Sequence, residues 1–253
     1  MKLCVIGGAG ARSAFLTKSL VKSARDIRVD HIVLLDNDQQ KLKTYGEISR
    51  ELARRLDPDL TFEVTSDARA ALTGVDYIIT TIRAGEDAGR LFDEQTCLAH
   101  GVLGQETTGA GGFAMAIRSV PTLVYYCTLA REVANPGHLI FNFTNPSGII
   151  TQALRSKGFD NVYGICDAPS GFIKQLEEIL EIPYGTLDIE CYGLNHLSWF
   201  RNAKVNGRDV QRELLDNPRT YEHSEMRLFT REMARISGDC MLNEYLYFYY
   251  RRG

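Results

Sequence analysis

Residues 2–13 decide the fold of this chain, and they read KLCVIGGAGARS. The apolar run Lys2–Ile6 ends abruptly at Gly7, Gly8 and Gly10. A short apolar run of this kind predicts a buried strand, and glycines directly after it predict a tight turn into a helix. The stretch is therefore typical of the first strand and first helix of an α/β domain.

Strand and helix patterns alternate along the residues that follow. Residues 101–112 are rich in glycine and threonine, which predicts a loop. The alternation predicts a doubly wound, Rossmann-like parallel sheet with right-handed crossovers. We expect its other strands at His31–Leu35, Thr61–Thr65 and residues 76–82, 139–143 and 162–166, and helices over 14–24, 39–56 and 114–133 and from near Pro146.

The composition is that of an ordinary globular protein, with 44% hydrophobic residues among 253. The 29 lysines and arginines nearly balance the 32 aspartates and glutamates, for a net charge of −3. We expect neither a nucleic-acid nor a membrane partner, because both need a concentrated basic face. The six cysteines form no C-x-x-C pair and are too sparse for a secreted disulfide scaffold, so we expect a cytoplasmic protein.

The glycine turn has the chemistry of a dinucleotide site. From Gly8 the residues follow the pattern G-x-G-x-x-S, whose small residues let a pyrophosphate approach the backbone at a helix N-terminus. Asp36 ends the next predicted strand, where a carboxylate can accept hydrogen bonds from a ribose and favours NAD over NADP. A merely tight turn would share the glycines, but strand, turn, helix, strand and Asp in that order favour NAD. Its predicted binding residues are Gly7, Gly8, Gly10, Ala11 and Asp36.

The alternation fades after about Tyr184. Residues 187–192 and 196–205 are predicted antiparallel strands, and the aromatic-rich residues 244–252 predict a packed helix. We expect an NAD-binding domain at residues 1–168 and the beginning of an α+β substrate or catalytic domain at residues 169–253. A large apolar face at the end of a chain needs something to pack on, so we expect the chain to be truncated.

Cys166 and His196 are candidate metal ligands. Each is placed at the end of a predicted strand, where a parallel sheet collects its ligands. A thiolate and an imidazole would leave open positions on a divalent metal for water or substrate, which suits catalysis. Taken singly, these signals have simpler interpretations: a Cys and a His so far apart are commonly unrelated, Asp167 fits a helix cap or a surface carboxylate, and Asn145 fits an N-cap before Pro146.

Taken together, these segments resemble glycoside hydrolase family 4, the NAD- and divalent-metal-dependent glycosidases. The most specific matches are GQETTG at residues 104–109 and NFTNPSG at residues 142–148. Members of the family are longer, so the chain resembles their N-terminal part, whose first domain is similar to lactate and malate dehydrogenases. The other matching segments are VIGG at 5–8, LD at 35–36, residues 83–94, GICD at 164–167 and GLNH at 193–196.

The resemblance implies a redox mechanism, which differs from the usual glycosidase scheme with two carboxylates. NAD⁺ takes a hydride from sugar C3, and a base removes the acidified proton at C2. The glycosidic oxygen then leaves from C1, water adds, and the hydride returns. The metal, for which the family implies Mn²⁺, polarises the oxygens on C2 and C3.

The resemblance also implies binding roles for residues of this chain. Cys166 and His196 match the two metal ligands of the family. Asn145 and Arg90 match residues that bind the substrate. Arg83 lies in a matching segment, and we expect it to contribute to the NAD site.

Two catalytic roles follow from the same resemblance. Asp167 matches the proton donor to the leaving group in the α-specific members. The family's base is a tyrosine in an aromatic segment, and Tyr245 is the best match, with Tyr247 and Tyr249 as alternatives.

The anomeric preference stays open. Cys166-Asp167 is shared with α-specific members, whereas GGFAMA at residues 111–116 and HLSWF at residues 196–200 look more like β-specific members. We favour a 6-phospho-β-glucosidase that binds a small phosphorylated sugar and is a homo-oligomer in its full-length form. The alternatives are a 6-phospho-α-glucosidase or α-galactosidase of the same family, a plain hydroxy-acid dehydrogenase, against which the metal pair argues, and a truncated NAD-binding module without activity.

Overall fold

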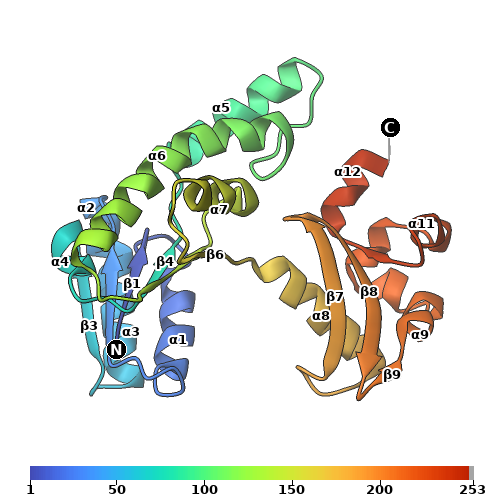
Figure 1. The fold of residues 1–253 in the computed structure, drawn as a ribbon, viewed down its shortest axis with the longest axis horizontal. Helices are drawn as coiled ribbons and strands as arrows, with labels where there is room; N and C mark the ends of the chain where they lie inside the picture. The colour runs from blue at the N-terminus through green and yellow to red at the C-terminus, as the bar shows by residue number, and fades with distance from the viewer. Residues whose placement is uncertain (251–253) are drawn as a thin grey trace. The chain divides into compact units, whose positions relative to one another are not determined.

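A six-stranded parallel sheet forms the centre of the first of two compact units, Met1–Ile165 (Figure 1). The second unit is Cys166–Gly253, and the computed structural model describes residues 1–250, with only the backbone of Tyr250. The strand order β3-β2-β1-β4-β5-β6 is that of a doubly wound dinucleotide-binding sheet, so the predicted fold class is confirmed. The strands are β1 Lys2–Ile6, β2 His31–Leu35, β3 Thr61–Thr65, β4 Tyr77–Thr80, β5 Leu139–Asn142 and β6 Val162–Gly164.

Helices connect these strands and cover the sheet (Figure 1). Along β1, Cys4 and Ile6 belong to one hydrophobic core, and Leu3 and Val5 belong to another. Burial of both faces explains why β1 and β2 are apolar runs in the sequence. The helices are α1 Ser13–Ser23, α2 Gln39–Lys41, the π-helical turn η1 Leu42–Gly46, α3 Glu47–Leu56, α4 Ala68–Leu72, α5 Glu86–Ala99, α6 Gly109–Val133 and α7 Ser147–Ser156.

The helix expected over residues 39–56 is present, with the π-helical turn η1 inside it. Helices α4 and α5 lie where no helix is predicted. The last residues of the expected loop are instead the first turn of α6. Here a Cβ atom on Gly111 would lie 2.5 Å from the backbone oxygen of Gln105, and one on Gly112 would lie 2.7 Å from Thr107 C. The glycines therefore allow close packing of loop on helix.

Helix α6 is long and apolar, with 25 residues. By length and composition alone it could cross a membrane, a test that the core helix of a globular protein also passes. Its buried residues include Leu123, Cys127 and Ala130, which belong to the core on one face of the sheet. We therefore interpret α6 as a core helix of the first unit.

An antiparallel sheet and short helices form the second unit. Strands β7 (Leu187–Leu194) and β8 (Leu197–Val205) make a hairpin, and both β9 (Arg208–Asp209) and β10 (Met241–Leu242) pair with β8. Behind the sheet, Phe172 packs edge-on against Phe200 with ring centroids 4.9 Å apart. The helices are α8 Asp167–Leu180, α9 Gln211–Asp216, α10 Thr220–His223, η2 Glu225–Leu228, α11 Arg231–Ile236, η3 Glu244–Leu246 and α12 Tyr247–Tyr250.

The antiparallel strands that we predicted are present, with different ends. Strand β7 continues to Leu194, and His196 lies in the turn that follows rather than in a strand. The strand predicted over residues 162–166 ends at Gly164, and Cys166 is the N-cap residue of α8. Of the helix predicted over residues 244–252, the 3₁₀ turn η3 and the short α12 are observed, and residues 251–253 lie outside the described residues.

Candidate functional site

The glycine turn lies at the carboxyl end of β1 and leads into α1. Gly7 has a φ of +83°, and the N–H groups of Gly7 and Gly8 donate to Leu35 O at 2.8 and 3.0 Å. A Cβ atom on Gly7 would lie 2.6 Å from Thr81 O, and one on Gly8 would lie 2.9 Å from a side-chain atom of β2. A Cβ atom on Gly10 would have none of the surrounding atoms within 4 Å. The chain's own packing thus requires the first two glycines and leaves open space at Gly10.

Asp36 reaches back to this turn from the end of β2. Its Oδ2 accepts a hydrogen bond from the Ala9 N–H at 3.1 Å, and its Oδ1 accepts one from the Asp38 N–H at 3.1 Å. The N-cap residue of α1 is Arg12, whose side chain makes no capping hydrogen bond, so no side chain competes with an anion at this helix N-terminus. Ala11 is exposed on the same turn. The structure therefore brings Asp36 and the predicted residues of the turn together.

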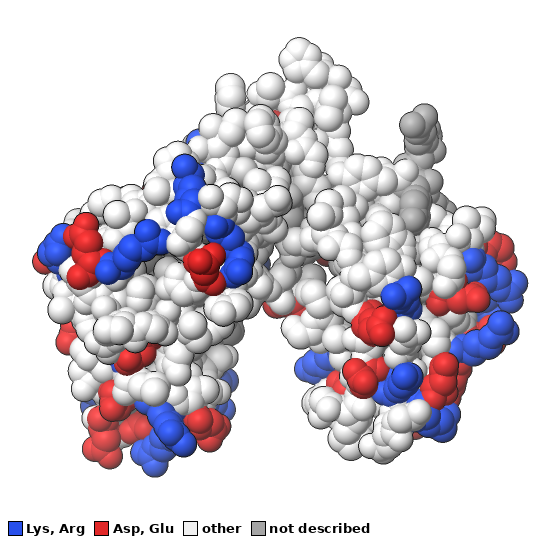
Figure 2. Space-filling view, viewed as in Figure 1, with Lys and Arg blue, Asp and Glu red and all other residues white. Residues whose placement is uncertain are grey.

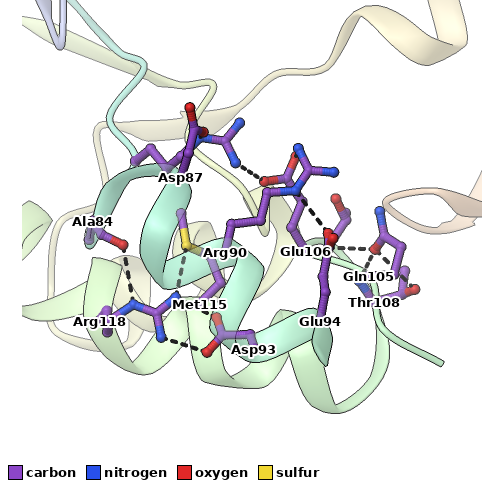
Figure 3. A network of polar contacts seen from close by, with 12 residues as sticks. Ala84, Asp87, Arg90, Asp93, Glu94, Gln105, Glu106, Thr108, Met115 and Arg118 are labelled. Carbon is purple, nitrogen blue, oxygen red and sulfur yellow. Dashed lines mark hydrogen bonds and ion pairs between the residues drawn. The ribbon is translucent and has the colours of Figure 1, made fainter. Parts of the chain in front are cut away.

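Arg83 and Arg90 share the carboxylate of Glu106 (Figure 3). Arg83 forms an ion pair with Glu106 and a second one with Asp87 at 3.4 Å. Arg90 Nε donates to Glu94 at 2.8 Å, and Arg90 Nη1 lies 3.5 Å from the Glu106 carboxylate. The Glu106 side chain is only 15% exposed, so it orients both guanidinium groups from a largely buried position. No role is predicted for Glu106 from the sequence, because its burial and its two arginine partners depend on the folded chain.

Arg118 joins α6 to α5 beside this cluster (Figure 3). Both of its η nitrogens donate to the Asp93 carboxylate, one of them at 2.9 Å, and its Nε donates to Ala84 O at 3.2 Å. Asp93 is 7% exposed, so this bidentate pair compensates a buried charge. Since α5 also carries Arg90, the pair helps to position a candidate substrate-binding residue. Nothing in the sequence pattern indicated it.

Asn145 follows β5, and a buried network supports its loop. Asn142, which is fully buried, accepts a hydrogen bond from Thr80 Oγ1 at 2.8 Å and donates to Thr144 O at 3.3 Å. Because β5 pairs with β4, and β4 pairs with β1, Asn145, Arg83 and the glycine turn follow the carboxyl ends of adjacent strands. Ligands bind at this edge of a doubly wound sheet.

In the second unit, Cys166 Sγ and His196 Nε2 lie 3.4 Å apart. Cys166 is the N-cap residue of α8, and His196 occupies the β7–β8 turn with a φ of +59°, which is uncommon for a residue with a side chain. The ring of Tyr245 stacks on that of His196, with centroids 4.4 Å apart and planes at 22°. Among the described residues, the buried His196 Nδ1 has no hydrogen-bond partner. The structure thus assembles the predicted metal ligands and the predicted base into one cluster.

The surroundings of this pair shift the pKa of both side chains. Burial raises the pKa of Cys166, but hydrogen bonds led by the one from His196 outweigh it, so the pKa lies below its ordinary value. Burial lowers the pKa of His196, but the contact with Cys166 and the charges of Glu244 and Glu225 raise it above its ordinary value. Metals bind the thiolate of cysteine and the neutral imidazole of histidine, so metal binding by this pair would depend on pH.

Glu225 is a buried carboxylate of the same unit. It is 8% exposed, and its Oε2 accepts hydrogen bonds from Asn243 Nδ2 at 3.3 Å and from the Glu244 N–H at 3.2 Å. Burial and the nearby charge of Glu244 raise the pKa of Glu225 to about 7. No role is predicted for Glu225 from the sequence, because a glutamate in a polar stretch gives no signal of burial.

The remaining candidates of the second unit are Asp167, Tyr247 and Tyr249. Asp167 is exposed at the first position of α8, with Oδ1 4.0 Å from Cys166 Sγ. The cap interpretations are wrong for both Asp167 and Asn145, since the N-cap residues are Cys166 and Pro146. Of the alternative bases, Tyr247 packs against the core of the unit and Tyr249 is 46% exposed. Among residues 1–250, no group of three or more His, Cys, Asp or Glu residues is arranged to hold a metal ion.

Sequence comparison identifies the family. Residues 2–182 match the family 4 glycosyl hydrolases, and residues 191–253 match the C-terminal domain of the same family. The chain belongs to glycosyl hydrolase family 4. The glycine turn, Asn145 and Cys166 lie in the first matched segment of this family 4 chain, and His196 and Tyr245 lie in the second.

Curated relatives of this family 4 chain are named as phosphoglucosidases of both anomeric types. It is 35% identical over 219 residues to the 6-phospho-beta-glucosidase BglT of Thermotoga maritima, a match that covers 86% of this chain and 51% of the relative. It is 32% identical over 225 residues to the phospho-alpha-glucosidase PagL of Clostridium acetobutylicum, covering 85% of this chain and 50% of the relative. The chain therefore spans about half the length of the curated relatives it matches.

Solved structures agree with this assignment. The 6-phospho-beta glucosidase of Thermotoga maritima with NAD and glucose-6-phosphate superposes with a TM-score of 0.87 at 32% identity, covering 99% of this chain and 59% of that chain. A 6-phospho-alpha-glucosidase from gut microorganisms, in complex with NAD and Mn²⁺, superposes with a TM-score of 0.88 at 27% identity. The match covers 98% of this chain and 60% of that chain. Malate dehydrogenase from Salinibacter ruber shares the Rossmann-like fold, with a TM-score of 0.62 at 18% identity. This match covers 97% of this chain and 72% of that chain.

The residues present fit the cofactors that the family implies. The open space at Gly10 and the uncapped start of α1 fit a pyrophosphate. Cys166 and His196 offer one sulfur and one nitrogen donor at a distance that a shared divalent metal can bridge. A hard ion such as Mn²⁺ would take oxygen atoms of water or substrate as its other ligands.

Proposed function

We propose that this family 4 chain carries the NAD- and metal-binding part of a 6-phospho-β-glucosidase that works by oxidation at C3, deprotonation at C2, elimination and water addition. The observation that carries the proposal is the contact between Cys166 and His196, with Tyr245 stacked on the His196 ring. The same chain contains a dinucleotide-binding sheet. The 35% identity to a 6-phospho-beta-glucosidase supports the β-glucoside.

In this proposal, residues 1–168 form the NAD-binding domain. When bound, NAD⁺ and Mn²⁺ supply hydride transfer and Lewis acidity. The backbone from Gly7 to Ala11 holds the pyrophosphate, and Asp36, which already accepts one hydrogen bond on each oxygen, has lone pairs left for the ribose hydroxyls. Arg83 contributes positive charge near the same edge of the sheet.

The substrate roles fall to side chains that the structure holds in place. Arg90, held by Glu94, and Asn145, supported by the buried Asn142 network, would bind sugar hydroxyls or phosphate oxygens. Cys166 and His196 would hold the metal ion.

Proton transfer would use two further side chains: Tyr245, within residues 169–253, and Asp167, just before them. Tyr245 accepts the proton from C2, and its stacking on His196 keeps the phenol beside a metal ligand. Asp167 is solvent-exposed next to Cys166, where it can deliver a proton to the leaving oxygen on C1.

A 6-phospho-α-glucosidase is the second candidate. The Asp167 carboxyl directly after Cys166 and the 32% identity to a phospho-alpha-glucosidase favour it.

We also propose that the full protein is a homo-oligomer, in which a second copy covers an apolar face of the first unit. On α6, four exposed residues at spacings of four form a stripe, and three of them are 57–62% exposed. Helix α5 adds three apolar side chains that are 55–70% exposed. Figure 2 shows few charged side chains on the part of the surface where Figure 1 places α5. The face consists of Phe113, Ile117, Pro121 and Tyr125 on α6 and Leu91, Phe92 and Leu98 on α5.

The size of this face supports a second copy as its occupant. At roughly 200 Å² per aromatic side chain, Phe92, Phe113 and Tyr125 together expose roughly 400 Å². With the aliphatic members, the face exceeds what a monomer commonly shows and approaches the roughly 800 Å² that each partner buries in a stable dimer. Replacing Phe113 and Tyr125 by serine should shift the mass in light scattering toward the monomer. An unchanged mass would refute this interface.

We propose a cytoplasmic location on the chemistry of the thiols. All six cysteines are free, and the lowered pKa of Cys166 makes its thiolate easy to oxidise outside a reducing compartment.

The proposed activity is tested with nitrophenyl 6-phospho-α- and 6-phospho-β-glucosides, under reducing conditions, with NAD⁺ and Mn²⁺ each added or omitted. We expect nitrophenol release from the β-anomer that requires both additions. Release from the α-anomer alone would favour the second candidate. NAD⁺ binding without turnover of any substrate would indicate a nucleotide-binding module that is not an active enzyme by itself.

A further inference from the structure

A cavity in the second unit lies apart from all the residues discussed above. Its volume is about 360 Å³, within the range of pockets for small molecules. Side chains of α9, α10 and α11 line it, together with Asp239, which precedes β10. Its charged lining consists of Arg212, Arg231, Arg235, Asp216 and Asp239.

The three arginines of this cavity differ in how they are held. Arg231 is anchored, because its Nη2 donates to Asp216 O at 2.7 Å and its guanidinium lies over the Tyr221 ring at 5.7 Å. Arg212 and Arg235 are exposed, and neither forms an ion pair or a side-chain hydrogen bond with any residue in the described range 1–250. Their donors are therefore available to a ligand in the cavity.

Tyr221 is part of the wall of the cavity and helps to hold Arg231. Its hydroxyl oxygen is buried, so a ligand in the cavity would contact the ring and not the hydroxyl group.

We propose that this cavity binds a small phosphorylated molecule. Guanidinium groups match the oxygens of a phosphate in bidentate geometry, and three of them suit a dianion better than a single carboxylate. Asp216 and Asp239 accept hydrogen bonds from hydroxyl groups on the same ligand. Three arginines and two aspartates give the lining a formal charge of +1, which suits a phosphate ester that also carries neutral hydroxyls.

The cavity would be a second site for a phosphorylated ligand, distinct from the candidate catalytic residues. None of its lining residues is a candidate for NAD, metal or substrate binding. Binding there would therefore survive the loss of the metal pair, which separates this proposal from the proposed enzymatic function.

The test measures the affinity of the chain for inorganic phosphate by isothermal calorimetry, at constant ionic strength. The variant Arg212→Met/Arg235→Met removes both available guanidiniums from exposed positions, so we expect a folded chain whose Kd is at least about tenfold higher. The matched control is Arg201→Met/Arg208→Met, which removes two exposed arginines that pair with Glu190 and Glu213 on the surface. This control should leave the Kd within about twofold.

Two further variants locate the binding. Tyr221→Phe removes only the buried hydroxyl and keeps the ring in the cavity wall, so it should leave the Kd within about twofold. Cys166→Ser should bind phosphate like the original chain. The proposal is overturned if the original chain shows no saturable binding, if both arginine double variants have the same Kd, or if Cys166→Ser abolishes the binding.

Discussion

Replacing Arg118 by methionine should lower the free energy of unfolding by about 2–4 kcal/mol. The guanidinium donates twice to Asp93 and once to Ala84 O, and Asp93 is 7% exposed. The methionine would leave a carboxylate buried without its counter-charge, which costs about 3–5 kcal/mol in fully buried pairs. Because the Arg118 side chain is 31% exposed, solvent screens part of this cost, and we expect a loss about 1 kcal/mol smaller than in a fully buried pair.

A double-mutant cycle isolates this interaction. The variant Asp93→Leu/Arg118→Met removes both charges, so it should cost no more than about 1 kcal/mol, and the coupling energy should exceed about 1 kcal/mol. Urea unfolding is followed by circular dichroism and by the fluorescence of Trp199, the only tryptophan, and coincident transitions justify two-state analysis. If the single losses simply add in the double variant, the account of this pair is wrong.

Four further substitutions test other parts of the molecule. Gly8→Ala should destabilise the chain by about 1–3 kcal/mol, because the new Cβ would lie 2.9 Å from Leu34 Cβ. Gly10→Ala should leave the melting temperature unchanged, because its Cβ meets no atom within 4 Å, and should weaken NAD⁺ binding in a fluorescence titration. Cys166→Ser should weaken Mn²⁺ binding in an electron paramagnetic resonance titration by at least about tenfold and leave NAD⁺ affinity intact; unchanged Mn²⁺ affinity would remove this residue from the metal site. The pKa of Glu225 is raised from 4.5 to about 7, so its contribution to stability is complete below pH 4.5 and is lost as the pH rises through about 7, by at most roughly 3 kcal/mol. Glu225→Gln should therefore flatten the decline of unfolding free energy between pH 5 and pH 8 in urea titrations of the metal-free chain, and a parallel decline in both proteins would contradict the assignment.

The parts of the fold that depend on local apolar runs could be predicted from the sequence. Three strands of the parallel sheet, at Lys2–Ile6, His31–Leu35 and Thr61–Thr65, have the predicted bounds. Burial on both faces makes the first two apolar segments, whereas Thr61–Thr65 is an edge strand with no buried residue, recognisable from its β-branched and aromatic residues. Helix α5 could not be predicted in this way, since its sequence is rich in charges and Asp93 is its one buried residue. Its buried Asp93 pairs with Arg118, which lies 25 residues away, and no local pattern reports such a contact.

The candidate site shows the same division. The glycine turn and Asp36 have a recognisable order along the chain, and the structure brings them within hydrogen-bond distance. For Cys166 and His196, the local reasoning from strand ends was wrong, because one residue caps a helix and the other lies in a hairpin turn. The two side chains nevertheless meet at 3.4 Å. Glu106 and Glu225 owe their properties to burial and to distant partners, so only the folded structure could point to them.

The three glycines of the first turn separate the demands of folding from those of binding. A side chain on Gly7 or Gly8 would collide with the chain itself, so the fold accounts for both without any ligand. A side chain on Gly10 would collide with nothing in the protein, and its φ is not in the left-handed region, so neither packing nor backbone conformation requires a glycine there. The space that this residue leaves lies at the start of α1, where the helix dipole favours an anion. A glycine that the fold does not need, at a place that suits a phosphate, is the strongest sign in the first unit that this turn serves a cofactor.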